Sequence, residues 1–203
     1  FRRVLFRSCN YKGVSGTSVA QDFVELPSQI MEHWAVEPEV LKLYAKHYET
    51  REVIPDELIT KIQNQGTFNQ GFMTTELLAA ALLDMELHNL TDTENLNVVA
   101  FEKETMDKLG LIPEIAPRYR ATYFSHIIGG YAAGYYSYLW AEVLDTDAFE
   151  AFKEHGVFDK NTADSFRKNI LEKGGTEDPM TLYRGFRGAD PSLEPLLKNR
   201  GLK

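Results

Sequence analysis

The sequence predicts a mainly α-helical domain. Apolar residues recur at intervals of three and four along most of the 203-residue chain, which is helical spacing. Alternation of apolar and polar residues is hard to find, so strands are not expected. Proline and glycine stand where helices would begin and end. The length fits one domain, or two at most, since domains commonly hold roughly 100–200 residues.

The first part of the chain predicts two helices close together. Residues 19–34 carry apolar side chains at helical spacing, and Pro27 inside this pattern should kink the helix near Phe23 because proline has no N–H to donate. Pro38 suits the first turn of a second helix over residues 38–48.

Two further helices are expected before residue 91. Pro55 opens a short one that ends near Gly66. Thr74 or Thr75 could cap a longer one over residues 75–90, which are rich in Leu, Ala and Met.

The second half predicts a broken segment followed by four helices. Residues 91–121 are mixed, because Gly110, Pro113 and Pro117 interrupt any regular pattern. The four helices after them are expected over residues 132–152, 161–173, 179–186 and 191–199.

Composition excludes several classes of protein. No apolar run approaches the roughly 20 residues that span a bilayer, so we expect no membrane partner. The net charge of −8 argues against nucleic acid as a partner, because binding to it needs clustered Lys and Arg. The single cysteine, Cys9, excludes an internal disulfide and a multi-cysteine zinc site.

Residues 1–8 differ in character from the rest of the chain. They read FRRVLFRS, which matches one reading frame of a widely used sequencing-library adapter. They have no initiator Met, no apolar h-region and no cleavage site, so they do not read as a signal peptide. We expect residues 1–8 to be a translated read artefact, and residues 9–203 to be native sequence that starts mid-gene.

The segment before Trp34 places acidic residues on one expected helix face. The polar residues at this spacing are Ser18, Asp22, Glu25, Gln29 and Glu32. The pattern alone favours a solvated face, and a zinc site would also need imidazoles from elsewhere in the protein.

Residues 126–142, HIIGGYAAGYYSYLWAE, are the most distinctive stretch of the chain. Tyr131, Tyr135 and Tyr138 share one helix face, which could be an aromatic core stripe. However, each buried phenol needs a hydrogen-bond partner, and the nearby glycines weaken a helix. A flexible loop that presents phenols to a substrate fits these residues better.

Both stretches resemble the thimet oligopeptidase family of zinc metallopeptidases, which includes oligopeptidase A and peptidyl-dipeptidase. Residues 16–34, GTSVAQDFVELPSQIMEHW, are similar to the segment that follows the family's zinc-binding motif. The resemblance covers about residues 11–203. It implies the C-terminal helical part of a zincin-type metallopeptidase with a deep substrate channel.

The resemblance also implies roles for individual residues. Glu25 would be the third protein ligand of one zinc ion, and Asp22 would orient a ligand histidine. In the Gly/Tyr stretch, His126 and Tyr131 would bind substrate, and Tyr138 would help stabilise the tetrahedral intermediate. Tyr135 is a weaker candidate for substrate contact that could simply pack.

The His-Glu-x-x-His motif of the family is absent from this sequence. None of the five histidines, which are His33, His47, His88, His126 and His155, belongs to such a motif. By the family's spacing the motif would lie about two dozen residues before Glu25, at or before residues 1–8. We therefore expect a fragment that lacks two zinc ligands and the general base and is inactive alone.

The expected activity is hydrolysis of short peptides. The leading interpretation is a peptidyl-dipeptidase that releases C-terminal dipeptides, and the alternative is an endo-acting oligopeptidase of the same family. A rival of another class is a non-catalytic helical module that binds peptides. We expect a monomer in the cytoplasm, with the periplasm as the alternative compartment.

Overall fold

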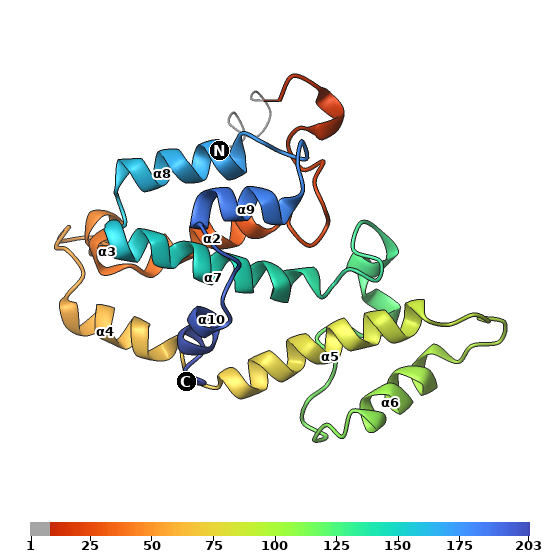
Figure 1. Cartoon of the computed structure of the whole chain (residues 1–203). Helices are drawn as coiled ribbons and strands as arrows, with labels where there is room; N and C mark the ends of the chain where they lie inside the picture. The colour runs from red at the N-terminus through yellow and green to blue at the C-terminus, as the bar shows by residue number, and fades with distance from the viewer. Residues whose placement is uncertain (1–8) are drawn as a thin grey trace. The chain divides into compact units, whose positions relative to one another are not determined.

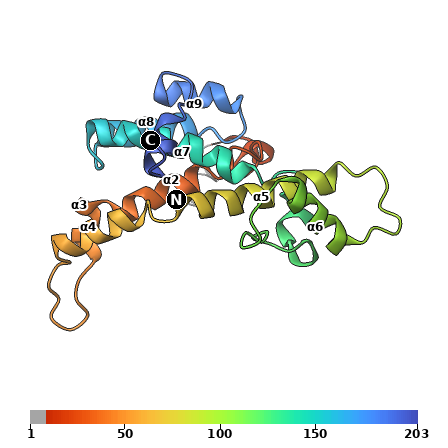
Figure 2. The same ribbon diagram turned by 90° about the horizontal axis from the view of Figure 1, so that it is seen from below.

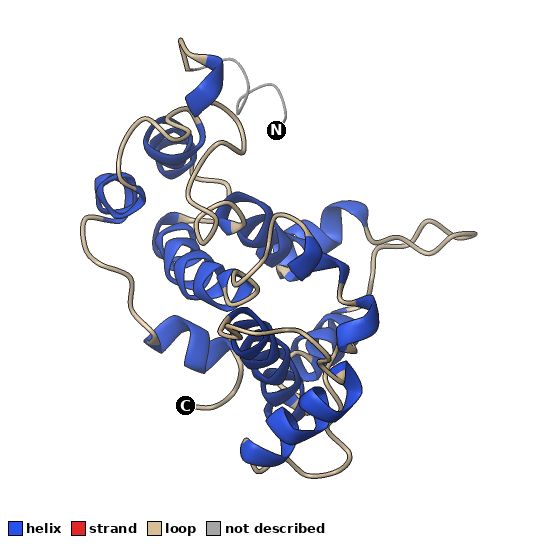
Figure 3. Ribbon diagram, turned by 90° about the vertical axis from the view of Figure 1, so that its right-hand side faces the viewer, coloured by secondary structure: helices blue, strands red, loops and turns tan. Residues whose placement is uncertain are grey.

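The computed structural model describes residues 9–203 as helices joined by turns and loops (Figures 1 and 3). Within that range there is no β-strand, only an isolated antiparallel bridge between Lys46 and Val53. The mainly α-helical fold predicted from the sequence is therefore confirmed. The prediction about residues 1–8 lies outside the described residues.

The chain divides into two compact units, each of which is treated by itself. Among the described residues, the first comprises 9–68 and 140–203, and the second comprises 69–139. The first unit contains η1 (Lys12–Val14), α2 (Leu26–Val36), α3 (Pro38–Tyr44), α4 (Asp56–Gln65), most of α7 (Ser137–His155), α8 (Lys160–Phe166), a π-helical segment (Arg167–Leu171), α9 (Pro179–Arg187) and α10 (Glu194–Asn199). The second contains α5 (Gln70–His88), α6 (Val98–Lys108), η2 (Ala121–Tyr123), η3 (Ser125–Ile128) and the first residues of α7.

Helix α2 begins later than the sequence pattern suggested. Residues 21–25 form turns, and Pro27 lies in the first helical turn instead of kinking a longer helix near Phe23. The first turn is where a residue without an N–H costs least, since those donors have no partner inside the helix. Ser18 and Asp22 therefore precede α2, and the expected continuous acidic helix face is wrong.

The loop after α3 ends that helix earlier than predicted. The chain turns back after Tyr44, and the N–H of Ile54 donates to the carbonyl of Ala45 at 2.9 Å. A second bond in this turn joins the N–H of His47 to the carbonyl of Glu52 at 2.8 Å. These bonds replace those that a helix over residues 38–48 would have made.

Helix α5 begins before the threonines that were expected to cap it. Asn69, in the left-handed conformation, precedes its first residue. The hydroxyl of Thr75 instead donates to the carbonyl of Gly71 inside the helix, at 2.7 Å. The mixed segment after α5 also contains a helix, α6, because the side chain of Asn97 caps it by accepting the N–H of Ala100.

Toward the C-terminus the predicted helices exist but differ at their ends. Helix α7 starts at Ser137 because the residues before it form turns, and α10 starts at Glu194 instead of residue 191. The helix predicted over residues 161–173 is α8, which widens into the π-helical segment. Helices α4 and α9 match their predictions to within one residue at each end.

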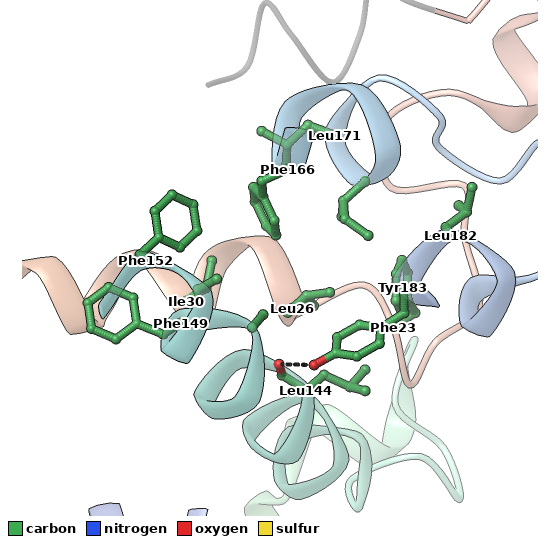
Figure 4. Packing of buried hydrophobic residues seen from close by; sticks show 12 residues of the cluster. Phe23, Leu26, Ile30, Leu144, Phe149, Phe152, Phe166, Leu171, Leu182 and Tyr183 are labelled. Carbon is green, nitrogen blue, oxygen red and sulfur yellow. Dashed lines mark hydrogen bonds between the residues drawn. The ribbon is translucent and has the colours of Figure 1, made fainter. Parts of the chain in front are cut away.

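The first unit has one main hydrophobic core (Figure 4). Helices α2, α7, α8 and α9 and the π-helical segment all contribute to it. Its buried members are Phe23, Leu26, Ile30, Leu144, Ala148, Phe149, Phe152, Phe166, Ile170, Leu171, Leu182 and Tyr183. Tyr183 is fully buried, and its hydroxyl oxygen lies 3.1 Å from the carbonyl oxygen of Leu144.

The second unit packs α5 against α6, which lie side by side in both Figure 1 and Figure 2. Ala79 and Leu83 of α5 meet Met106 of α6 in one buried cluster. A second cluster packs Ala80 and Ala81 of α5 against Phe124, Ile127 and Tyr135, which lie in or just before the Gly/Tyr segment (residues 126–142). Helix α5 is thus the element on which this unit is built.

Three of the acidic residues of helix α7 bind partners from different parts of the first unit. Asp145 is 2% exposed and lies 2.6 Å from His33 Nε2, while Gln29 donates to it at 3.1 Å. The hydroxyl of Tyr183 donates to Asp147 at 2.6 Å. The remaining acid, Glu142, accepts two bonds from the guanidinium of Arg200.

Asp145 gives the first unit a stability that depends on pH. Burial raises the pKa of Asp145 to about 6 from an ordinary 3.8, although the hydrogen bond from His33 opposes this shift. Between about pH 4 and pH 6 the folded chain keeps a proton that the unfolded chain has released. The free energy of unfolding should therefore fall as pH rises through this window, and level off above it.

We predict that Asp145→Asn flattens this part of the pH profile, because an amide does not titrate. Wild type should lose on the order of 3 kcal/mol between pH 4 and pH 6, since a tenfold change in protonation is worth about 1.4 kcal/mol. Urea unfolding at a series of pH values measures both profiles. Glu39→Gln, at an exposed acid of α3, should keep the wild-type slope. A profile as steep in Asp145→Asn as in wild type would show that another group titrates.

Candidate functional site

The Gly/Tyr segment forms a compact aromatic cluster in the second unit. The chain passes from η3 through turns over residues 129–136 into the first turn of α7. This path brings the four predicted residues together with two further aromatic side chains. The members are Tyr119, Phe124, His126, Tyr131, Tyr135 and Tyr138.

Ring contacts fix the arrangement of the predicted residues. Tyr131 and Tyr138 stack, with centroids 5.0 Å apart and an interplanar angle of 18°. The ring of His126 lies 6.0 Å from that of Tyr131 and 6.1 Å from that of Tyr138. The three residues predicted to bind or stabilise a reacting peptide are therefore neighbours within one unit.

Tyr135 occupies the interior of the cluster. Its side chain is 3% exposed and packs against Tyr119, Phe124 and His126. Burial raises the pKa of Tyr135 to about 12, although the charge of Arg118 lowers it, and a hydrogen bond to Tyr119 contributes to the rise. This position favours packing for Tyr135, and its contact with substrate stays a prediction.

One atom of the cluster lacks a hydrogen-bond partner. Nδ1 of His126 is buried, and no residue in the range 9–203 bonds to it. An unsatisfied buried polar atom costs about 1–3 kcal/mol, and such atoms are rare outside sites that take a ligand or water. The cluster therefore offers a nitrogen to a group from outside the described chain.

Glu25 lies in the first unit, at the start of α2. It occupies the residue before the first helical position and is half-buried. The hydroxyl of Ser28 donates to its carboxylate. A negative charge is favourable here, because the free N–H groups of a helix start give it a positive end. Asp22 is half-buried in the preceding turns.

A cavity of about 210 Å³ opens beside Glu25 within the same unit. Most of its wall is apolar, and Glu25, Ser28 and Thr17 supply the polar side chains. The full lining is Gly16, Thr17, Val19, Phe23, Val24, Glu25, Pro27, Ser28, Ile170 and Gly174. The carboxylate predicted to bind metal thus borders on space that an apolar group could enter.

Gly174 and Gly175 pack closely against the segment that leads to Glu25. The N–H of Gly175 donates to the carbonyl of Val14 at 2.8 Å. A Cβ at Gly175 would lie 2.2 Å from the carbonyl oxygen of Ser18, and one at Gly174 would lie 2.2 Å from that of Val14. The sequence suggested only a helix stop at this pair, and the pairing of two adjacent glycines was the available signal for a close approach.

Other features differ from what the sequence alone suggested. Tyr119 and Phe124 belong to the aromatic cluster although they lie in or just after the mixed segment, where no periodic pattern marks them. His33 is bound to Asp145 and stacks on Phe149 at 4.8 Å, which makes it part of the core of the first unit.

The described residues do not make a complete metal site. Across residues 9–203, no three side chains of His, Cys, Asp or Glu come together in a way that could hold a metal ion. A catalytic zinc ion takes three protein ligands, so Glu25 alone does not fit it. In the same range no helix is long and apolar enough to cross a membrane.

Comparison with known proteins places the chain in a family. The sequence profile of peptidase family M3 matches residues 5–202. Dipeptidyl carboxypeptidase of Escherichia coli (strain K12) is 46% identical over 98% of this chain, and oligopeptidase A of the same organism is 42% identical over 94%. A thimet-like oligopeptidase of Dictyostelium discoideum is 30% identical over 95%.

These matches cover only part of each relative. The chain spans about 30% of the length of dipeptidyl carboxypeptidase and 28% of that of oligopeptidase A. Within that span the match is nearly continuous, and the resemblance to the thimet oligopeptidase family is confirmed. The chain belongs to peptidase family M3.

Proposed function

We propose that the whole protein of which this chain is part is a zinc-dependent metallopeptidase that hydrolyses short peptides. Membership of peptidase family M3 supports the reaction class. The unsatisfied Nδ1 of His126 inside a tyrosine cluster is the structural observation that carries the proposal, because it offers polar groups to a ligand. The deep substrate channel stays a prediction for the whole protein.

The proposed subtype is a peptidyl-dipeptidase that releases C-terminal dipeptides. The 46% identity to a dipeptidyl carboxypeptidase, against 42% to an oligopeptidase A, favours it over an endo-acting oligopeptidase. A peptide whose C-terminus is amidated separates the two modes. An exopeptidase that needs the free carboxylate should leave this peptide intact, and an endopeptidase should cleave it.

The aromatic cluster would act on the peptide through neutral hydrogen-bond donors. We assign substrate binding to His126 and Tyr131, whose rings are neighbours. Tyr138, stacked on Tyr131, would donate a hydrogen bond from its hydroxyl to the carbonyl oxygen as negative charge develops there. Such a donor lowers the barrier because it binds the transition state more strongly than the ground state.

Glu25 and Asp22 would serve the metal site of the whole protein. Glu25 offers one carboxylate ligand at the start of α2, and Asp22 would orient a histidine ligand. The other ligands and the general base must come from outside the described residues, so we propose that this chain alone is inactive. We further propose a monomer in the cytoplasm, with the periplasm as the alternative compartment.

We predict that Glu25→Gln in the whole protein lowers both zinc content and turnover. The amide keeps the size of the side chain but removes the anionic donor that zinc prefers. Elemental analysis after dialysis and a peptide-cleavage assay measure the two quantities. Glu32→Gln, at an exposed acid of the same helix, is the matched control and should change neither. Normal metal content and normal rate in Glu25→Gln would exclude Glu25 as a ligand.

We predict that Tyr138→Phe in the whole protein lowers kcat far more than it raises KM. The change keeps the ring and its stacking on Tyr131, so it removes only the hydroxyl. Loss of one donor to a developing oxyanion costs about 10²–10³ in kcat in comparable sites. Steady-state kinetics on a short peptide separate kcat from KM.

Tyr136→Phe is the matched control for this experiment. Tyr136 is 44% exposed and neighbours Tyr135 in the chain, but it is not one of the six members of the aromatic cluster. Removal of the Tyr136 hydroxyl should leave kcat nearly unchanged. Equal, small effects from both substitutions would mean that the tyrosines serve only as packing.

A further inference from the structure

Asp84 of α5 is a buried carboxylate that binds the Gly/Tyr segment through its backbone. Its side chain is fully buried. Oδ1 accepts the N–H of Ala133 at 3.0 Å, and Oδ2 accepts the N–H of Tyr135 at 2.9 Å. Both oxygens of one carboxylate thus bind alternate residues of the turn that precedes α7.

His88, one turn later on α5, completes the environment of this carboxylate. Its Nδ1 lies 2.9 Å from Oδ1 of Asp84 and also 2.9 Å from the backbone oxygen of Asp84. A buried carboxylate is tolerated only where donors satisfy it, and here two backbone amides and an imidazole surround it. An asparagine would offer one acceptor and place an NH₂ group against the second amide.

The turn that Asp84 binds has little stiffness of its own. Ala133 has a φ of +51°, in the left-handed region that an L-residue enters at a cost of roughly 1–2 kcal/mol. Gly129, Gly130 and Gly134 flank it and add backbone freedom that must be lost on ordering. The two bonds to Asp84 offset these costs, so they select this conformation from the many that the segment could adopt.

The bonds also set where the candidate catalytic residues lie. Tyr135 is bound at its N–H, and its carbonyl accepts the N–H of Tyr138 at 3.4 Å. The N–H of Gly134 donates to the carbonyl of Tyr131 at 2.9 Å. A shift at residues 133 and 135 would therefore move both Tyr131 and Tyr138.

We propose that Asp84 is a positioning residue for peptide hydrolysis, which fixes the turn over residues 129–136 and so places Tyr131 and Tyr138 against the substrate. This inference rests on the proposed function of the tyrosines. It assigns to Asp84 no contact with substrate. Its effect reaches the reaction only through the backbone of the Gly/Tyr segment.

The test is Asp84→Asn in the whole protein, with kinetics and hydrogen exchange measured on the same samples. We expect kcat to fall by on the order of a hundredfold with a smaller change in KM, because misplacement of a reacting group by about 1 Å costs this much. Mass-spectrometric exchange should become faster in the peptide that covers residues 129–138 while α6 stays protected. Glu86→Gln, at an exposed acid of α5, should match wild type in both readouts.

A second variant tests whether the effect runs through the backbone turn. Glycine adopts a φ near +51° without a side-chain penalty, so Asp84→Asn combined with Ala133→Gly should recover part of the lost kcat. Loss of the folded protein, exchange that is faster throughout α5 and α6, or no recovery in the double variant would each overturn the positioning role. So would unchanged kcat in Asp84→Asn.

Failure of the proposed function gives a different result. A wild-type protein without peptidase activity would refute the function. Faster exchange in the 129–138 peptide of Asp84→Asn would even then show that the bonds from Asp84 to Ala133 and Tyr135 order the turn. An active wild type whose Asp84→Asn variant is equally active refutes the positioning role alone.

Discussion

The structure of the first unit depends on the paired acids of one helix. Helix α7 presents Glu142, Asp145 and Asp147, and each binds a different part of the unit: the C-terminal Arg200, His33 of α2, and Tyr183 of α9. An unpaired buried carboxylate would be costly, so Asp145 and Asp147, which are buried, require their partner elements to be in place. Because His33 lies on the helix that Glu25 begins, the pair of His33 and Asp145 also determines where the candidate metal ligand sits within its unit.

The second unit uses the same kind of interaction beside its aromatic cluster. Asp84 satisfies two backbone amides of a glycine-containing turn, as Asp145 satisfies side chains of α2. In both places an aspartate on a long helix binds a neighbouring segment whose position its own sequence does not determine. These acidic side chains belong to α5 and α7, which are 19 residues long each. The candidate site residues lie in or beside the segments that these acids bind, which are α2 and the Gly/Tyr segment. Such support from a helix suits a site that must be ordered around a substrate.

Helix content followed from apolar spacing, because this spacing depends only on residues that are close together in the sequence. The start of α2 did not, since Pro27 is equally compatible with a kink and with a first turn, and apolar residues before it continue the pattern by coincidence. Helix α6 was hidden by the nearby glycine and prolines, although Asn97 is a good capping residue. For the site, a resemblance to a family singled out Glu25, His126, Tyr131 and Tyr138. The backbone groups that bind Asp84, and those that lie against the Gly174–Gly175 pair, are far away in sequence, and no periodicity indicates a contact over such separations.

The central claim is that this chain carries one part of a zinc peptidase, with the remaining ligands elsewhere in the whole protein. Zinc-dependent cleavage of a short peptide, assayed in parallel for the whole protein and for the purified 203-residue chain, tests it most directly. The account predicts that the whole protein cleaves the peptide, loses activity with a chelator and regains it with zinc, while the chain alone binds zinc weakly and cleaves nothing. Zinc-dependent cleavage by the chain alone, or chelator-insensitive cleavage by the whole protein, would contradict the account.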